Sequence, residues 1–202
     1  MSRGFSEREK AWITDSLIEQ GRILFRQLGF QKTSIADITK KVGIAQGTFY
    51  KFFRSKEELY FAILEKEEET IKKQWAEIDI ITDNQPKNTI KQILKSMLDT
   101  VETNPLLRDL YLGKHLPHMV HQLPPKRLKR HFSHDSTSLQ SLIGKWKQAG
   151  IILDDKPEII AGILRSLFLV TLHKQEVGEA VYKETMERLI DLIVDGLVKV
   201  EG

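Results

Sequence analysis

The chain contains no cysteine among its 202 residues. It therefore has no disulfide bond, no thiol nucleophile and no thiolate ligand for a metal. No run approaches the ~18 consecutive apolar residues of a membrane-spanning helix, and charged residues stand near the N-terminus, where a signal peptide has its apolar region. The motifs of phosphate-binding loops, serine hydrolases and zinc peptidases are also missing. These absences predict a soluble cytoplasmic protein that is not an enzyme, holds no cofactor or metal and does not enter a membrane.

What the sequence does contain, over residues 33–59, is a series of helix starts and stops. A serine is followed three residues later by an acid at Ser34 and again at Ser55. In such a pair the hydroxyl accepts a hydrogen bond from an unpaired backbone N–H, and the acid reaches back to the serine N–H. Between the two starts, Gly43 suits the left-handed conformation that ends a helix. This stretch therefore predicts two short helices around a glycine turn, followed by the start of a third.

The second of these short helices, expected over residues 44–53, has two distinct sides. Phe49 and Phe53 lie four residues apart and share the side that we expect to be buried. The remaining polar side chains are Gln46, Thr48, Tyr50 and Lys51. An amide can bond an adenine edge, a lysine can reach guanine or phosphate, and hydroxyl groups suit phosphate oxygens. With Gly47 leaving room for a close backbone approach, this side predicts a DNA-reading helix-turn-helix.

The segment resembles the DNA-binding domain of the TetR family of bacterial transcriptional regulators. The resemblance covers about the first sixty residues and rests on Leu24-Phe25, Gly29-Phe30, Thr33-Ser34-Ile35, Gly43-Ile44-Ala45-Gln46-Gly47-Thr48-Phe49-Tyr50 and Ser55-Lys56-Glu57-Glu58-Leu59. Two positions depart from the family pattern. Ala45 replaces the usual Ser, so that the recognition helix loses a side-chain cap typically worth ~1 kcal/mol, and Phe52, unlike the usual His or Tyr, cannot hydrogen-bond a phosphate.

The resemblance implies a role for each matching residue. Thr33 and Ser34 would meet a phosphate at the start of the second helix, Tyr50 and Lys56 would bind phosphates, and Gln46, Thr48 and Lys51 would face the bases. Simpler roles remain open: Thr33 and Ser34 as helix caps, Tyr50 as part of the core, Lys56 as a solvated lysine. A cation in the first turn of a helix opposes the helix dipole, which favours an anionic partner for Lys56.

The charge distribution supports the same interpretation. Residues 1–56 hold eleven Lys and Arg against five Asp and Glu, and the remaining residues hold twenty against twenty-three. The positive charge is thus concentrated where the motif lies, and neutralisation of phosphates supplies most of the sequence-independent affinity for DNA.

The rest of the chain predicts helices, because apolar residues recur at spacings of three and four. A first helix should begin at Ser6 with Glu9 and bury one stripe consisting of Ile13, Leu17, Gly21, Leu24 and Leu28. Residues 116–128 should form an irregular connection, with a short turn of helix as the alternative, followed by a helix over residues 136–149 and another from Pro157, closed by Gly178. The expected fold is all-α, with a three-helix DNA-binding domain over residues 1–56 and a larger helical ligand-sensing and dimerisation domain over residues 57–202.

The two C-terminal helices carry more apolar surface than one neighbour can cover. Apolar residues lie off the main stripe at Ile159, Leu169, Val170, Leu192 and Val198. We expect these helices to form half of a four-helix bundle in a homodimer, a pairing that the resemblance also implies; a fully buried monomer core is the alternative. A two-fold dimer would read an inverted repeat in double-stranded DNA, with half-sites ~34–36 Å apart.

The resemblance further implies a cavity for a small-molecule inducer among the middle helices. Candidate wall residues are Met97, Tyr111, His115, Trp146 and Phe168, each of which has a place in the plain core as its alternative. Five of the six histidines fall within twenty residues, namely His115, His118, His121, His131 and His134. This cluster suggests a metal site or a metal-dependent hydrolase, but Pro117 interrupts the helical spacing and few carboxylates are near. Loop histidines or a pH-sensitive pocket are therefore the preferred interpretation.

The preferred hypothesis is a repressor that binds its operator as a dimer and is released by a small molecule. Control by a protein partner, action as an activator, a nucleoid-type DNA-binding protein, and a metal- or His-dependent enzyme are the alternatives.

Overall fold

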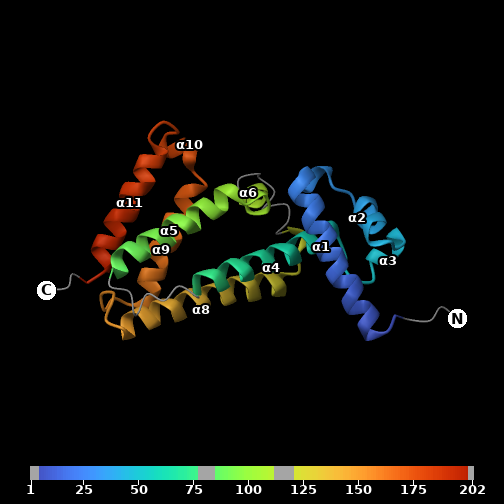
Figure 1. The fold of residues 1–202 in the computed structure, drawn as a ribbon, viewed down its shortest axis with the longest axis horizontal. Helices are drawn as coiled ribbons and strands as arrows, with labels where there is room; N and C mark the ends of the chain where they lie inside the picture. Colours follow the sequence, from blue (N-terminus) through green and yellow to red (C-terminus); the bar gives the residue numbers. More distant parts are fainter. Residues whose placement is uncertain (1–4, 77–84, 112–120, 200–202) are drawn as a thin grey trace. The chain divides into compact units, whose positions relative to one another are not determined.

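The computed structural model describes residues 5–76, 85–111 and 121–199. In this part of the chain every regular element is a helix, apart from one isolated antiparallel bridge between Ile152 and Val198, so the predicted all-α class is confirmed. The helices follow one another as α1 (Glu7–Lys32), α2 (Ile35–Val42), α3 (Gln46–Phe49), α4 (Lys56–Ala76), α5 (Pro86–Thr103), α6 (Pro105–Tyr111), α8 (Pro125–Gln148), α9 (Pro157–Thr171), α10 (Lys174–Val177) and α11 (Tyr182–Leu197) (Figure 1).

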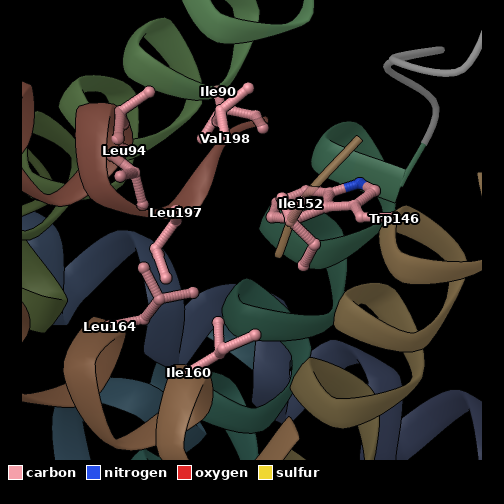
Figure 2. A pocket seen from close by; sticks show the side chains of 9 residues that line it. Ile90, Leu94, Trp146, Ile152, Ile160, Leu164, Leu197 and Val198 are labelled. Atoms are coloured by element: carbon pink, nitrogen blue, oxygen red, sulfur yellow. The ribbon is translucent and has the colours of Figure 1, made fainter. Parts of the chain in front are cut away.

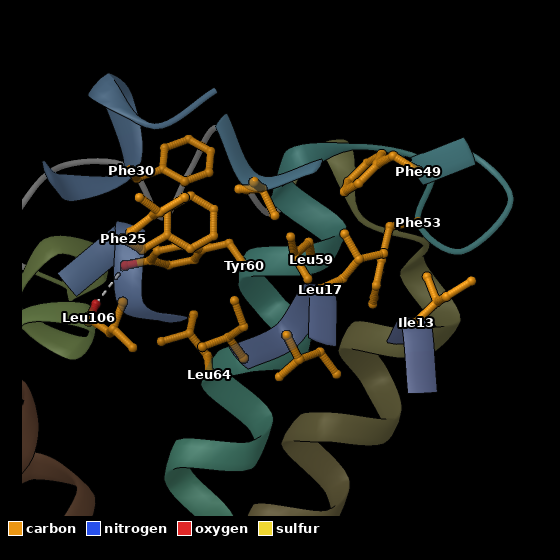
Figure 3. Close-up of a cluster of buried hydrophobic side chains, with 14 of the residues drawn as sticks. Ile13, Leu17, Phe25, Phe30, Phe49, Phe53, Leu59, Tyr60, Leu64 and Leu106 are labelled. Atoms are coloured by element: carbon orange, nitrogen blue, oxygen red, sulfur yellow. Dashed lines mark hydrogen bonds between the residues drawn. The ribbon is translucent and has the colours of Figure 1, made fainter. Parts of the chain in front are cut away.

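The chain forms two compact units, each with its own hydrophobic core. The first unit combines residues 1–71 with residues 104–128, and the second combines residues 72–103 with residues 129–202. The first unit extends beyond residue 56 because α4 contributes four side chains to its core (Leu59, Tyr60, Ile63 and Leu64) and α6 contributes Leu106 and Leu107 (Figure 3). The compact units do not test the predicted division into a DNA-binding domain and a ligand-binding domain after residue 56, which stays a prediction.

Helix α1 begins as predicted and ends with a kink. The Ser6 hydroxyl accepts from the N–H of Glu9, and the Glu9 carboxylate accepts from the N–H of Ser6. Near its end, Gly29 has φ +79° and ψ 165°, outside the helical region. Four predicted stripe residues are buried, but Leu28 is 47% exposed, so its predicted burial was wrong. It lies directly before the kink, where the stripe no longer continues.

Helix α2 has the predicted cap at each end. Ser34 accepts from the N–H of Asp37, and Gly43 ends the helix with φ 78° and ψ 30° while its N–H bonds the carbonyl of Thr39. Helix α3 is shorter than predicted, because only residues 46–49 are helical and turn hydrogen bonds continue the segment to Phe53. Ala45 supplies no side-chain cap, and Gly47 costs up to ~1 kcal/mol in a helix relative to alanine.

The start of α4 packs closely on α1. The Ser55 hydroxyl accepts from the N–H of Glu58 at 3.2 Å, which confirms the predicted helix start. A Cβ built on Gly21 would lie 3.0 Å from Ile63 Cδ1 and 3.1 Å from Leu59 Cδ2. The absence of a side chain at Gly21 therefore lets the two helices approach.

The second unit is built from helices α5, α9 and α11 with the main part of α8. Ile151 and Leu153, which precede α9, exchange backbone hydrogen bonds with Lys199 and Leu197 around the isolated bridge. No helix among the described residues combines the length and the apolar content that a bilayer crossing requires.

The predicted course of the chain before α9 needs one correction. Residues 121–122 are helical and α8 runs without interruption from Pro125 to Gln148, so the helix predicted to begin at residue 136 begins eleven residues earlier; residues 116–120 lie outside the described residues. Pro125 occupies the first helical position, where its missing N–H costs nothing, and the Pro124 carbonyl accepts from Arg127 and Leu128.

Candidate nucleic-acid interface

The α3 segment presents a polar surface on one side and fills the core with the other. Phe49 is fully buried and Phe53 is buried beside it, with ring centroids 5.9 Å apart. Gln46, Gly47 and Lys51 are exposed, Thr48 is half-buried, and Tyr50 is 55% exposed. The predicted separation of a core face from a polar face is thus present, and the segment brings all five candidate residues together.

Ser34 is exposed at the N-terminus of α2 and forms a reciprocal cap with Asp37. Its hydroxyl and its backbone N–H both donate to Asp37 Oδ2, at 2.5 and 3.2 Å. These hydrogen bonds, the one from the hydroxyl first, lower the pKa of the Asp37 carboxyl below its ordinary value of 3.8. The Asp37 carboxylate accepts from the Ser34 N–H, so that a DNA phosphate at this helix end would approach beside an existing negative charge.

Thr33 lies in the interior. It is 1% exposed, and its hydroxyl bonds the carbonyl oxygens of Gly29 at 2.9 Å and Leu24 at 3.3 Å. The side chain therefore closes the kinked end of α1, and a phosphate contact would have to come from the Thr33 backbone.

Lys56 also turns inward. Its ammonium donates to the carbonyl oxygens of Phe30 at 2.8 Å and Thr33 at 2.9 Å, and it lies 4.3 Å from the centroid of the Phe30 ring. Burial lowers the pKa of Lys56. Two carbonyl dipoles and a ring face thus supply the negative partner that the sequence suggested for this cation. Lys56 joins the start of α4 to the corner between α1 and α2.

Phe5 is an aromatic contact of the α3 segment that sequence reasoning did not predict. Its ring lies 6.0 Å from that of Phe52, and Lys51 Nζ lies 5.5 Å from the Phe5 ring centroid. Phe52, which cannot bond a phosphate, therefore has a packing partner. No local pattern in the sequence relates residue 5 to residues 51 and 52.

In the second unit, one predicted pocket residue lines a cavity. Trp146 is buried and faces an apolar cavity of about 10 Å³, whose other walls include Ile90, Leu94 and Val198 (Figure 2). A drug-sized ligand usually occupies ~300–1,000 Å³. The cavity in this conformation is therefore closed to such a ligand.

The other pocket candidates are half-buried or lie outside the described residues. Met97 and Phe168 are half-buried, and Met97 packs against the core of the second unit. The side chain of Tyr111 and the whole of His115 lie outside the described residues. Among the histidines of the cluster, His121 is exposed, while His118 and the side chains of His131 and His134 lie outside the description. Within the described residues no group of three or more potential ligands is placed to hold a metal.

Comparison with known proteins matches the N-terminal part of the chain to one family. Residues 17–63 match the model of the bacterial regulatory proteins of the tetR family. The uncharacterized HTH-type transcriptional regulator YvdT of Bacillus subtilis is 43% identical over 51 residues, which cover 25% of this chain and 26% of that protein. The nucleoid occlusion factor SlmA of Haemophilus influenzae is 28% identical over 91 residues, covering 45% of this chain and 41% of that protein. The chain thus spans less than half the length of these curated relatives.

The whole fold is shared with solved structures. A TetR-family transcriptional regulator from Pectobacterium atrosepticum aligns over 98% of this chain and 100% of its own, with a TM-score of 0.74 and 18% sequence identity. At this identity the likeness concerns the fold, and the N-terminal match adds the motif. Residues 17–63 thus match the DNA-binding domain of the bacterial tetR family, and the chain shares the helical fold of solved TetR-family regulators.

Proposed function

We propose that this protein is a cytoplasmic transcriptional regulator that binds an inverted-repeat operator as a homodimer, represses transcription there and is released by a small molecule. The observation that carries the proposal is the division of the α3 segment: Phe49 and Phe53 are buried while Gln46, Tyr50 and Lys51 are exposed. A polar, basic surface held by a rigid aromatic core is what a major groove accepts.

Within this surface we assign the base contacts to Gln46, Thr48 and Lys51 and a phosphate contact to Tyr50. Gly47 has nothing within 4 Å of where a Cβ would stand, so the space beside it is free for a DNA backbone. Ser34 would bring the backbone of the α2 start to a phosphate. Thr33 and Lys56 would act on DNA indirectly, because the structure engages both side chains with backbone carbonyls.

The dimer is proposed to form through α9 and α11. Large apolar side chains remain exposed on both helices, namely Ile159 and Leu169 on α9 and Leu192 on α11. On α9, steps of three, four and three residues lead from Ile159 through Gly162 and Ser166 to Leu169, so these positions share one face. On α11, Leu192 stands one turn from Gly196, beside which space is open. Exposed apolar knobs next to small residues favour a second copy of the same helices as the partner.

The small-molecule part of the proposal rests on the apolar cavity beside Trp146 together with the family resemblance. Since the cavity has a volume of only about 10 Å³, a ligand would need to open it, and it could shift the DNA-binding equilibrium only by the difference between its affinities for the two conformations. The chemistry of the walls favours an uncharged apolar or aromatic compound.

The decisive experiment is selection of bound duplexes from a random DNA pool at ~0.15 M salt, where non-specific affinity is weak. The proposal expects an enriched inverted repeat and a complex with two protein chains per duplex. Gln46→Ala should then relax the base preference, and Tyr50→Phe should weaken binding to all sequences alike. Leu192→Lys, placed on the proposed dimer face, should yield a monomer in analytical ultracentrifugation and lose operator affinity. A parent protein that enriches no sequence would overturn the proposal.

A second candidate is a DNA-binding role outside the control of single promoters. It is favoured by the similarity of 91 residues to a nucleoid occlusion factor. This candidate expects bound sequences at many places in a genome and no ligand-induced change in thermal stability. Mapping the bound sites across the genome of the source organism separates it from a regulator with one or a few operators.

A further inference from the structure

Arg127, in the first turn of α8, packs its side chain against one face of α4. Its Nη2 lies 2.5 Å from Glu65 Oε2, its Nη1 lies 3.4 Å from Glu58 Oε1, and its Cζ lies 5.2 Å from the ring centroid of Phe61. Residues 58, 61 and 65 follow one another at steps of three and four, so they share one side of α4. A single guanidinium thus connects two carboxylates that are about 10 Å apart along the helix axis.

This position is locally unfavourable for an arginine. A cation in the first turn of a helix opposes the helix dipole, and Arg127 Nε is buried without a hydrogen-bond partner among the described residues. The side chain is only 18% exposed. The charge of Arg127 is therefore stabilised by the two carboxylates on α4 and not by the dipole of α8.

One of these carboxylates also binds the end of the recognition segment. Glu58 Oε2 accepts from the backbone N–H of Arg54 at 2.7 Å, while Glu58 Oε1 faces Arg127. Arg54 directly follows Phe53, the buried aromatic with which the turn after α3 ends. The Glu58 carboxylate thus joins the first turn of α8 to the backbone that leaves the DNA-reading surface.

We propose that Arg127 is a positioning residue for DNA reading, which fixes the Glu58 carboxylate and, through it, the backbone at Arg54. The inference rests on the proposed DNA-binding function and adds a residue, remote in sequence from the helix-turn-helix, on which that function depends. Arg127 also precedes by two residues the point where the chain passes into the second unit, at Lys129. Displacement of the first turn of α8 would therefore release the recognition segment without any change in its own sequence.

Three variants test the proposal in the full-length protein. Arg127→Met removes the charge and keeps an unbranched apolar stem over Phe61. Lys126→Met is the matched control, because Lys126 is exposed in the same turn and loses the same charge. Glu58→Gln keeps an oxygen acceptor for the Arg54 N–H and removes the charge that faces Arg127.

Two readouts are measured on each variant: the dissociation constant for the selected operator, and amide hydrogen exchange at Arg54 in the free protein. Arg127→Met should weaken operator binding about tenfold, as expected for loss of a charge-assisted hydrogen bond, and should speed exchange at Arg54 by a similar factor. Lys126→Met should change both by less than about twofold, since one exposed charge is largely screened. Combining Arg127→Met with Glu58→Gln should weaken binding no further than Arg127→Met alone, because both act through one connection.

Unchanged operator affinity in Arg127→Met, additive losses in the combined variant, or an equal loss in Lys126→Met would each overturn the proposal. If Arg127→Met fails to fold, Glu58→Gln carries the test, with faster exchange at Arg54 and weaker binding expected. Failure of the proposed function gives a different result, because the parent protein would then select no DNA sequence. The inferred role of Arg127 in DNA reading would be wrong in that case. Exchange at Arg54 in the free protein would still show whether the connection exists.

Discussion

Replacing Lys56 by methionine separates the two explanations for a lysine at the start of α4. The variant keeps the unbranched stem and removes the ammonium, which donates to the carbonyl oxygens of Phe30 and Thr33. Hydrogen bonds to a charged group contribute about 1.5–3 kcal/mol each, and the lower end applies because the side chain is half-buried. Methionine also avoids the cost of burying the ammonium, which lowers the pKa of Lys56, so we expect a net loss of about 2 kcal/mol in the free energy of unfolding. For a unit of roughly 100 residues this lowers the melting temperature by about 10 °C.

The assay combines thermal unfolding, followed by circular dichroism, with operator binding at several salt concentrations. Removing one phosphate contact reduces the slope of log affinity against log salt by about 0.9. If Lys56 is a structural link, its loss should lower the melting temperature and leave that slope unchanged. Lys51→Met provides the control with the opposite expectation, since Lys51 is exposed on the proposed DNA-reading surface. A Lys56→Met protein that melts with the parent and loses about one unit of slope would refute the reasoning.

Three further predictions concern the same unit. Tyr60→Phe removes the buried hydrogen bond of 2.8 Å to the Leu106 carbonyl (Figure 3) and should cost about 1 kcal/mol in chemical denaturation; an unchanged midpoint would contradict it. Gly47→Ala should stabilise α3 by up to ~1 kcal/mol yet weaken operator binding, and improved binding would argue against a close backbone approach there. Because Ser34 lowers the pKa of Asp37, this carboxylate stabilises the fold fully above its ordinary value of 3.8 and less as the pH falls through the lowered value. In Ser34→Ala the free energy of unfolding should therefore fall less steeply as the pH drops below about 4. An unchanged pH dependence in this range would exclude the contribution.

The sequence predicted those features of the first unit that depend on near neighbours along the chain. The caps at Ser6 and Ser34 and the turn at Gly43 involve bonds between residues three or four positions apart, so a short pattern is enough to indicate them. The burial of Phe49 and Phe53 follows from their helical spacing in the same way. These local rules locate the proposed DNA-reading surface before any tertiary contact is known.

Other features depend on contacts between distant residues. The inward turn of Lys56 rests on carbonyl groups 23 and 26 positions earlier in the chain, and the Glu58 carboxylate meets Arg127, 69 positions later. No pattern within a window of a few residues contains this information. The consequence for the candidate site is that two residues matched by family resemblance, Thr33 and Lys56, are held by the protein backbone.

In the α3 segment, the side chains that stabilise the fold are not the ones that face outward. Phe49 and Phe53 hold the segment in place, and the residues that face outward, among them Gln46 and Lys51, are exposed. Substitutions at the outward positions therefore cost the fold little, and a duplicated copy of the gene can change these side chains while the protein remains folded. Selection for stability and selection for target choice act here on different side chains.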